Sequence, residues 1–119
     1  MQSYKDLVVW QKAIQLVKEI YLISGTFPKS ELFGLTSQVR RASVSIPANI
    51  AEGYARKHRA EYLQFLRIAF ASGAELETHL ILIKELRFAK QTDTRNAESL
   101  LDEVMRMLNK LISTLTSKP

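Results

Sequence analysis

Apolar residues recur along most of this chain at alternating spacings of three and four positions, the spacing that places side chains on one face of an α-helix. The alternation of apolar and polar residues at every second position, typical of strands, is missing. With only four glycines and three prolines in 119 residues, few positions can interrupt a helix. The pattern therefore predicts an all-α chain.

The periodic pattern divides into four helical segments with short connections. In order, they run from after Asp6 to Gly25, from about Ser30 to Arg56, from about Arg59 to Phe88, and from the 90–94 turn to about Leu115. Helices of this length pack most simply as an antiparallel, up-down-up-down four-helix bundle. Residues 1–119 are the usual size of a single domain, and we predict one bundle domain.

Pro47 lies well inside the second predicted helix, where it removes a backbone donor and clashes with the preceding turn. We expect a kink there, and we expect the carbonyl of Ser43 to lose its helical donor. The side chain of Asn49 is able to fill such a vacancy. A structural role at the kink explains Ser45, Pro47 and Asn49 better than catalysis does.

The first predicted helix carries two apolar rows, whereas packing on a single core needs one. One interpretation is a central, deeply buried helix. The other is that one row forms an interface between copies of the chain, with candidate residues Val8, Val9, Trp10 and Ala13.

Residue types that carry catalytic chemistry are scarce. The absence of cysteine excludes disulfides and thiolate metal sites. Neither His58 nor His79 has the Glu three positions earlier that di-iron bundles use, or an Arg four to seven positions earlier as in bundle-shaped ribonucleases. No glycine-rich phosphate loop is present. We predict a protein that is not an enzyme, with no catalytic residue, metal or cofactor, and an uncatalogued ribonuclease ranks last.

Positive charge is the remaining functional signal. Seventeen Lys and Arg against twelve Asp and Glu give a net charge of +5, which attracts polyanions. The densest basic run surrounds the turn between the second and third helices, and an isolated Arg-Arg pair precedes it in the second helix. The candidate nucleic-acid-binding residues are Arg40, Arg41, Lys57, Arg59 and Arg67. The alternative interpretation is a solvated face that keeps the protein soluble.

The longest apolar runs span only a few residues, far short of the roughly 20 that cross a bilayer. No basic stretch followed by an apolar one is visible at the start of the chain. We therefore expect a soluble, cytoplasmic protein with no membrane partner.

One stretch is far more specific than composition. The segment from Leu35 to Gly53 reads LTSQVRRASVSIPANIAEG, flanked by Val9–Ala13, Phe27–Pro28 and Phe65–Ala69. It closely resembles the signature of the four-helix-bundle proteins encoded in intervening sequences of bacterial 23S ribosomal RNA genes. The resemblance extends to about Leu86, and the fourth helix matches in pattern only. Arg87 and Phe88 stand where the family leads us to expect a Gly-Tyr-like pair.

The resemblance implies a bundle that assembles as a homo-oligomer, in relatives a pentameric ring. It also implies distant kinship with the accessory proteins of diversity-generating retroelements, basic pentamers that associate with nucleic acid and a reverse transcriptase. It carries over no active site. We therefore expect a non-enzymatic, homo-oligomeric bundle that binds nucleic acid, with RNA favoured, through backbone charge. The alternative is a scaffold or adaptor that docks a partner protein and has no nucleic-acid role.

Overall fold

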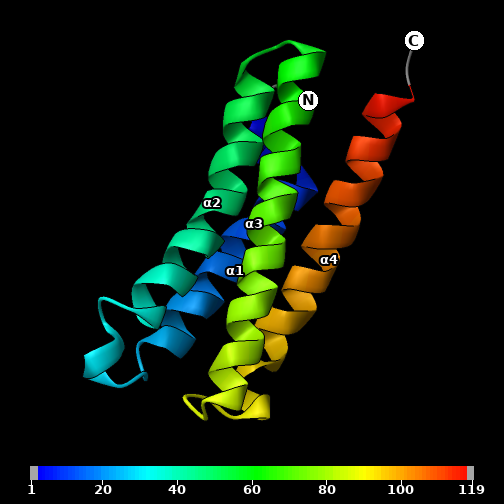
Figure 1. The fold of residues 1–119 in the computed structure, drawn as a ribbon. Coiled ribbons are helices and arrows are strands. Elements are labelled where there is room, and N and C mark those ends of the chain that lie inside the picture. The colour runs from blue at the N-terminus through cyan, green and yellow to red at the C-terminus, as the bar shows by residue number, and fades with distance from the viewer. Residues whose placement is uncertain (1–2, 118–119) are drawn as a thin grey trace.

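Residues 3–117 are described by the computed structural model, and they form four long α-helices joined by short connections (Figure 1). The helices are α1 (Val8–Ser24), α2 (Leu35–Ala55), α3 (Arg59–Glu85) and α4 (Gln91–Thr116), with the short 3-10 helices η1 (Tyr4–Asp6) and η2 (Lys29–Glu31). Consecutive helices run in opposite directions, and the bundle measures 49 × 22 × 20 Å. No strand occurs within residues 3–117. The predicted all-α four-helix bundle is confirmed.

Two helix starts differ from the prediction. Helix α1 begins at Val8 rather than directly after Asp6, because Asp6 belongs to η1 and Leu7 is the N-cap. Helix α2 begins at Leu35 rather than near Ser30, because η2 forms a separate turn ahead of it. The N–H of Leu35 donates to Glu31 Oε1 at 3.3 Å, so the side chain that satisfies this helix start comes from the preceding turn.

Helix α3 ends earlier than predicted because Arg87 adopts a positive φ of 61°. The N–H of Phe88 donates to the carbonyl of Ile83 at 2.9 Å, and that of Arg87 donates to Lys84 at 3.0 Å. This is the Schellman pattern, in which glycine usually occupies the left-handed position. Arg87 stands where the family resemblance led us to expect glycine, and glycine would adopt this positive φ without strain.

All four helices contribute to one core. Its largest fully buried side chains come from each helix in turn: Leu16 and Ile20 from α1, Ile46 and Ile50 from α2, Leu66, Leu76 and Ile83 from α3, and Val104 and Leu108 from α4. None of the helices within residues 3–117 contains an apolar stretch that could span a lipid bilayer.

The core takes one of the two apolar rows of α1. Val9 is 6% exposed and Ala13 is fully buried against the other helices of the same chain. Assigning these two residues to an oligomer interface was therefore wrong, because their side chains are already covered. Val8 is 54% exposed, and the half-buried Trp10 lies edge-on to Tyr4 with ring centroids 5.4 Å apart. Val8 and Trp10 stay candidates.

Helix α2 continues through Pro47, and the half-buried side chain of Asn49 finds its partners one turn earlier in the same helix. The side-chain amide of Asn49 donates to the carbonyl and the hydroxyl of Ser45, at 2.7 and 2.9 Å. The expectation that Asn49 would donate to the carbonyl of Ser43 was wrong. The Ser45 and Ser72 hydroxyls lie 2.8 Å apart and link α2 to α3. The kink at Pro47 stays a prediction.

Helices α2 and α3 come closest at Gly53. A Cβ atom added there would lie 2.7 Å from Cβ of Phe65 and 3.2 Å from a ring carbon of Tyr62, both on α3. Cβ of Phe65 is fixed to the backbone and cannot rotate away, so only a shift of the helix would relieve the overlap. Glycine is therefore required here for the close approach of the two helices.

We expect Gly53→Ala to lower the free energy of unfolding by about 1–3 kcal/mol, the usual cost of overpacking a close contact. Gly25→Ala is the matched control, because its Cβ would meet nothing closer than 3.4 Å. Urea denaturation of the two variants measures the difference. Equal stability of both variants would contradict the close approach at Gly53.

A polar cluster fastens α3 to the first turns of α4. Lys84 Nζ lies 2.5 Å from Glu98 Oε2, and Oε1 of the same carboxylate accepts from Thr94 at 3.0 Å and from Gln91 at 3.1 Å. Burial alone would raise the pKa of Glu98, but the hydrogen bonds from Lys84, Thr94 and Gln91 and the Lys84 charge outweigh it and lower that pKa.

Because the folded chain lowers the pKa of Glu98, this carboxylate stabilises the fold above the ordinary glutamate value of 4.5. Its contribution is lost as pH falls below that value towards the folded pKa. We expect the urea midpoint to fall more on acidification in the parent than in Glu98→Gln, which has no charge to lose. The same pH dependence in both proteins would show that Glu98 is not coupled to folding.

Candidate nucleic-acid interface

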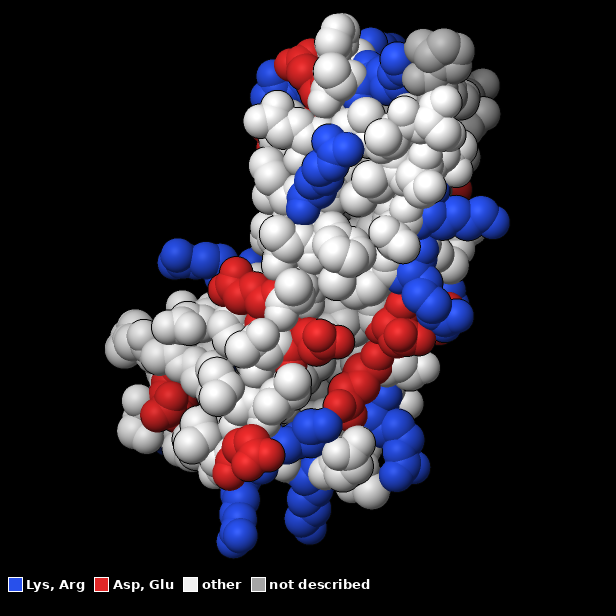
Figure 2. All heavy atoms as spheres, turned by 45° about the vertical axis from the view of Figure 1, so that its right-hand side comes forward, with Lys and Arg blue, Asp and Glu red and all other residues white. Residues whose placement is uncertain are grey.

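The five candidate cations fall into two separate groups. Arg40 and Arg41 lie in the first half of α2, whereas Lys57 lies in the turn that follows it, Arg59 begins α3, and Arg67 follows two turns later. Arg41 and Lys57 are sixteen residues apart, about 24 Å at the helical rise of about 1.5 Å per residue. On the face shown in Figure 2, most acidic side chains lie over the lower half of the bundle, whereas basic ones are spread along its whole length. The predicted residues therefore do not form one patch on a single chain.

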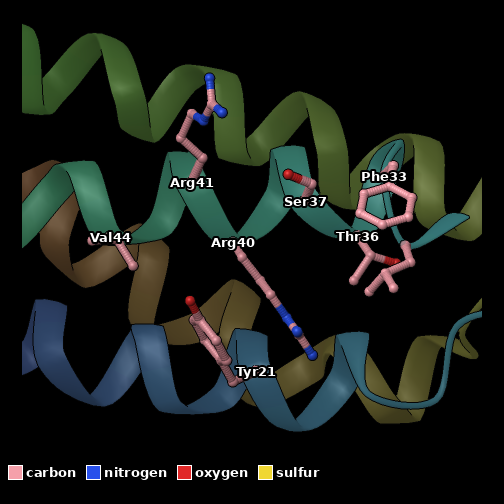
Figure 3. A pocket seen from close by; sticks show the side chains of 8 residues that line it. Tyr21, Phe33, Thr36, Ser37, Arg40, Arg41 and Val44 are labelled. Carbon is pink, nitrogen blue, oxygen red and sulfur yellow. The ribbon is translucent and has the colours of Figure 1, made fainter.

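Arg40 points from α2 towards Tyr21 of α1, whereas Arg41 points away from α1 (Figure 3). The Nε of the half-buried Arg40 donates to Ser24 Oγ at 2.7 Å, and its guanidinium lies 4.6 Å from the centre of the Tyr21 ring. Arg40 is thus engaged in holding α2 against α1. Arg41 is exposed and has no side-chain partner within residues 3–117.

Both arginines border an open groove of about 510 Å³ along α2 (Figure 3). Its lining combines cations with apolar and hydroxyl side chains: Tyr21, Leu32, Phe33, Thr36, Ser37, Arg40, Arg41 and Val44. Phe33, at one end of the groove, is 93% exposed, and the neighbouring Leu32 is 51% exposed. An apolar surface of this kind is typical of a contact with another molecule.

The opposite end of the bundle, at the α2–α3 turn, holds a second pocket of about 390 Å³. It is lined by residues of α2, the turn, α3 and α4: Gly53, Tyr54, Lys57, His58, Arg59, Tyr62 and Leu115. The rings of Tyr54 and Tyr62 stand nearly perpendicular, at 88°, with centroids 5.9 Å apart. Lys57 and Arg59, two of the predicted residues, therefore border the same aromatic pocket.

The two tyrosines were not among the predicted site residues. Burial raises the pKa of the Tyr62 phenol, and the neighbouring Tyr54 adds to that rise, so the hydroxyl is neutral at physiological pH. A signal was present in the sequence, because Tyr54 lies three positions before Lys57 and Tyr62 three positions after Arg59. The basic run is flanked by aromatic residues on both sides.

The acidic residues near this turn are occupied by Arg56. Its guanidinium pairs with Glu52 at 3.4 Å and Glu61 at 3.6 Å, and lies 5.0 Å from the centre of the Phe65 ring. His58 Nδ1 is 3.8 Å from Glu61. Among the described residues, no carboxylate lines the pocket itself.

Lys57 and Arg67 present their charges to solvent at this end. Lys57 has no side-chain hydrogen bond or ion pair in the described part of the chain, and its φ is +55°. An L-residue takes this left-handed conformation at a cost that glycine avoids. The exposed Arg67 lies 3.5 Å from the hydroxyl of Thr116, close along α4 to the pocket residue Leu115. Within residues 3–117, no group of three His, Asp or Glu side chains is placed to hold a metal ion.

Comparison with known proteins identifies the family. Residues 5–110 match the model of the 23S rRNA-intervening sequence proteins. A crystal structure from Bacteroides thetaiotaomicron, of a protein with unknown function from the S23 ribosomal protein family, superposes with a TM-score of 0.79. The match covers 88% of this chain and 98% of that one at 24% identity, which shows a shared fold. No curated protein matches this chain. The family match spans most of the sequence, and the chain belongs to the 23S rRNA-intervening sequence protein family.

Proposed function

We propose that this chain is a non-enzymatic, cytoplasmic, homo-oligomeric bundle that binds nucleic acid, with RNA favoured, at its α2–α3 end. Lys57, Arg59 and Arg67 contact phosphates, and the binding is electrostatic and tolerant of sequence. The net charge of +5 supports this proposal. Near the turn, Glu52 and Glu61 are paired with Arg56, so they do not neutralise Lys57.

One observation carries the proposal. Lys57 is a cation without a side-chain partner within residues 3–117, held in a left-handed conformation that glycine would adopt more cheaply, at the rim of an aromatic pocket. A residue that costs stability at an exposed turn is best explained by what its side chain does. A phosphate contact uses that charge directly.

Assembly would multiply this small patch, because several copies in one particle gain avidity without any new kind of contact. The family resemblance supports a ring of five. The exposed Val8 lies in an apolar groove of about 350 Å³ between the start of α1 and the end of α4, lined also by Leu7, Met107 and Leu111. We propose that this groove contacts a second copy.

Replacing Lys57 by glycine separates function from stability. We expect Lys57→Gly to raise the free energy of unfolding by about 0.5–1 kcal/mol, because the relief of left-handed strain exceeds the entropy cost of glycine. The same change should weaken RNA binding. On a single strand, it should also reduce the slope of log affinity against log salt by about 0.7 for each phosphate that the protein no longer neutralises. Fluorescence anisotropy at several salt concentrations measures the affinity and the slope, and urea denaturation measures the stability.

Arg87→Gly is the matched control. It removes one basic charge from a left-handed position, with φ of 61°, at the other end of the bundle. We expect a similar gain in stability and a smaller loss of affinity. If the two variants bind RNA equally well, the α2–α3 end is not the binding site.

Light scattering of the parent should give a mass that is a multiple of 13.6 kDa. From the family resemblance we expect five copies. We expect Val8→Asp to lower that mass, because it puts a charge into an apolar contact. Leu22→Asp is the control on the same helix, at a residue that is more exposed, 70% against 54% for Val8. A monomeric parent would refute the assembly, and an unchanged mass in Val8→Asp would refute this interface.

The groove beside Phe33 favours a second candidate function, a scaffold that docks another protein. Its apolar lining and two arginines suit a partner segment that carries both apolar and acidic side chains. A scaffold predicts weak polyanion binding that is indifferent to Lys57. The anisotropy comparison of Lys57→Gly with the parent therefore distinguishes the two functions.

A further inference from the structure

The pocket between Tyr54 and Tyr62 has a feature that phosphate contacts leave unused, namely its aromatic lining. We propose that this pocket receives one unpaired base of a single-stranded nucleic acid, so that the chain prefers single strands to duplexes. The inference deepens the proposed function and rests on it.

The two rings offer a base the surfaces that it needs. Both tyrosines are half-buried, so part of each ring remains open to the pocket. The planes of the two rings stand at 88° to each other. A planar base that stacks face to face on one ring therefore lies perpendicular to the other ring and contacts it edge to face. Leu115 adds an apolar contact from α4, and the volume of about 390 Å³ holds a single base with room for water. Stacking of this kind tolerates any base.

The rim supplies charge next to the stacked base. Lys57 and Arg59 line the same pocket as the tyrosines. The phosphates on either side of a nucleotide lie within a few ångströms of its base, so a base in the pocket brings phosphate to these cations. Aromatic faces beside a basic rim are the usual composition of single-strand binding sites.

The polar groups of the pocket are compatible with this ligand. The Tyr62 phenol is neutral at physiological pH because burial raises its pKa, so it does not repel phosphate. Neither tyrosine hydroxyl donates or accepts a hydrogen bond among residues 3–117, which leaves both available to the polar edge of a base.

A duplex cannot use the pocket in this way. Its bases are already paired and stacked, and a side-chain pocket reaches them only if a base is first extruded at an energetic cost. The phosphates of a duplex still reach Lys57 and Arg59. Duplex binding should therefore depend on the cations alone, whereas single-strand binding should depend on both the cations and the tyrosines.

The test compares a fluorescent single-stranded RNA without self-complementarity with the same strand annealed to its complement. We expect Tyr62→Leu and Tyr54→Leu each to weaken single-strand binding about tenfold while leaving duplex affinity and the salt slope unchanged. Tyr62→Phe, which keeps the ring, should retain most of the single-strand affinity. Phe70→Leu, which removes a half-buried aromatic ring of α3 outside this pocket, is the control for non-specific effects.

The outcomes separate this inference from the proposed function. A parent that binds neither RNA refutes both. Equal single-strand and duplex affinity, together with tyrosine variants that bind like the parent and a Lys57→Gly variant that binds less, refutes the base pocket and leaves the proposed function intact. Equal losses for both RNAs in Tyr62→Leu would assign the tyrosines a structural role and also refute the pocket.

A second measurement uses the unchanged protein, so it does not depend on the folding of a variant. A single strand that contains thiouridine is photocrosslinked to the parent, and the crosslinked residues are found by mass spectrometry. We expect crosslinks at Tyr54 or Tyr62. Crosslinks confined to the groove at Tyr21 and Phe33 would overturn the assignment.

Discussion

The close approach of α2 and α3 at Gly53 is the contact on which the candidate site depends. The two helices meet there with no space for a side chain, since Cβ of Phe65 would lie 2.7 Å from an added methyl group. This approach brings Tyr54, from the last turn of α2, against Tyr62, from the first turns of α3. A wider separation of the helices would part the two rings and open the pocket floor. The shape of this candidate site is thus tied to a residue that has no side chain.

The fold could be predicted from the sequence because the three-and-four spacing records which residues face the core. The helix ends were less predictable. Local backbone hydrogen bonds define the turn at Lys29–Glu31 and the left-handed end of α3 at Arg87. The spacing of apolar residues does not mark either of them. Periodicity also shows that a row is apolar without showing what covers it. For this reason Val9 and Ala13 were candidates for an interface in one of two interpretations, although the chain's own helices bury them.

The site was predictable in its charge and not in its shape. A basic run can be seen directly in a sequence, and Lys57, Arg59 and Arg67 do lie at one end of the bundle. The pocket beside them needs side chains from three helices, including Leu115 of α4, and their proximity comes from packing. Likewise, Arg40 and Arg41 are adjacent in the sequence, whereas helical geometry points their side chains in different directions (Figure 3).

The two pockets lie at opposite ends of a rod 49 Å long, and they differ in chemistry. One end presents tyrosines and cations around a turn, and the other presents an exposed phenylalanine. A simple cyclic assembly contains only rotations about one axis, and no such rotation turns a subunit end over end. If the copies lie with their long axes along that axis, all α2–α3 ends face one side of the particle and all Phe33 ends face the other. The particle would therefore have two chemically different rims. Each ligand could then approach from its own side, and occupation of one rim would leave the other sterically free.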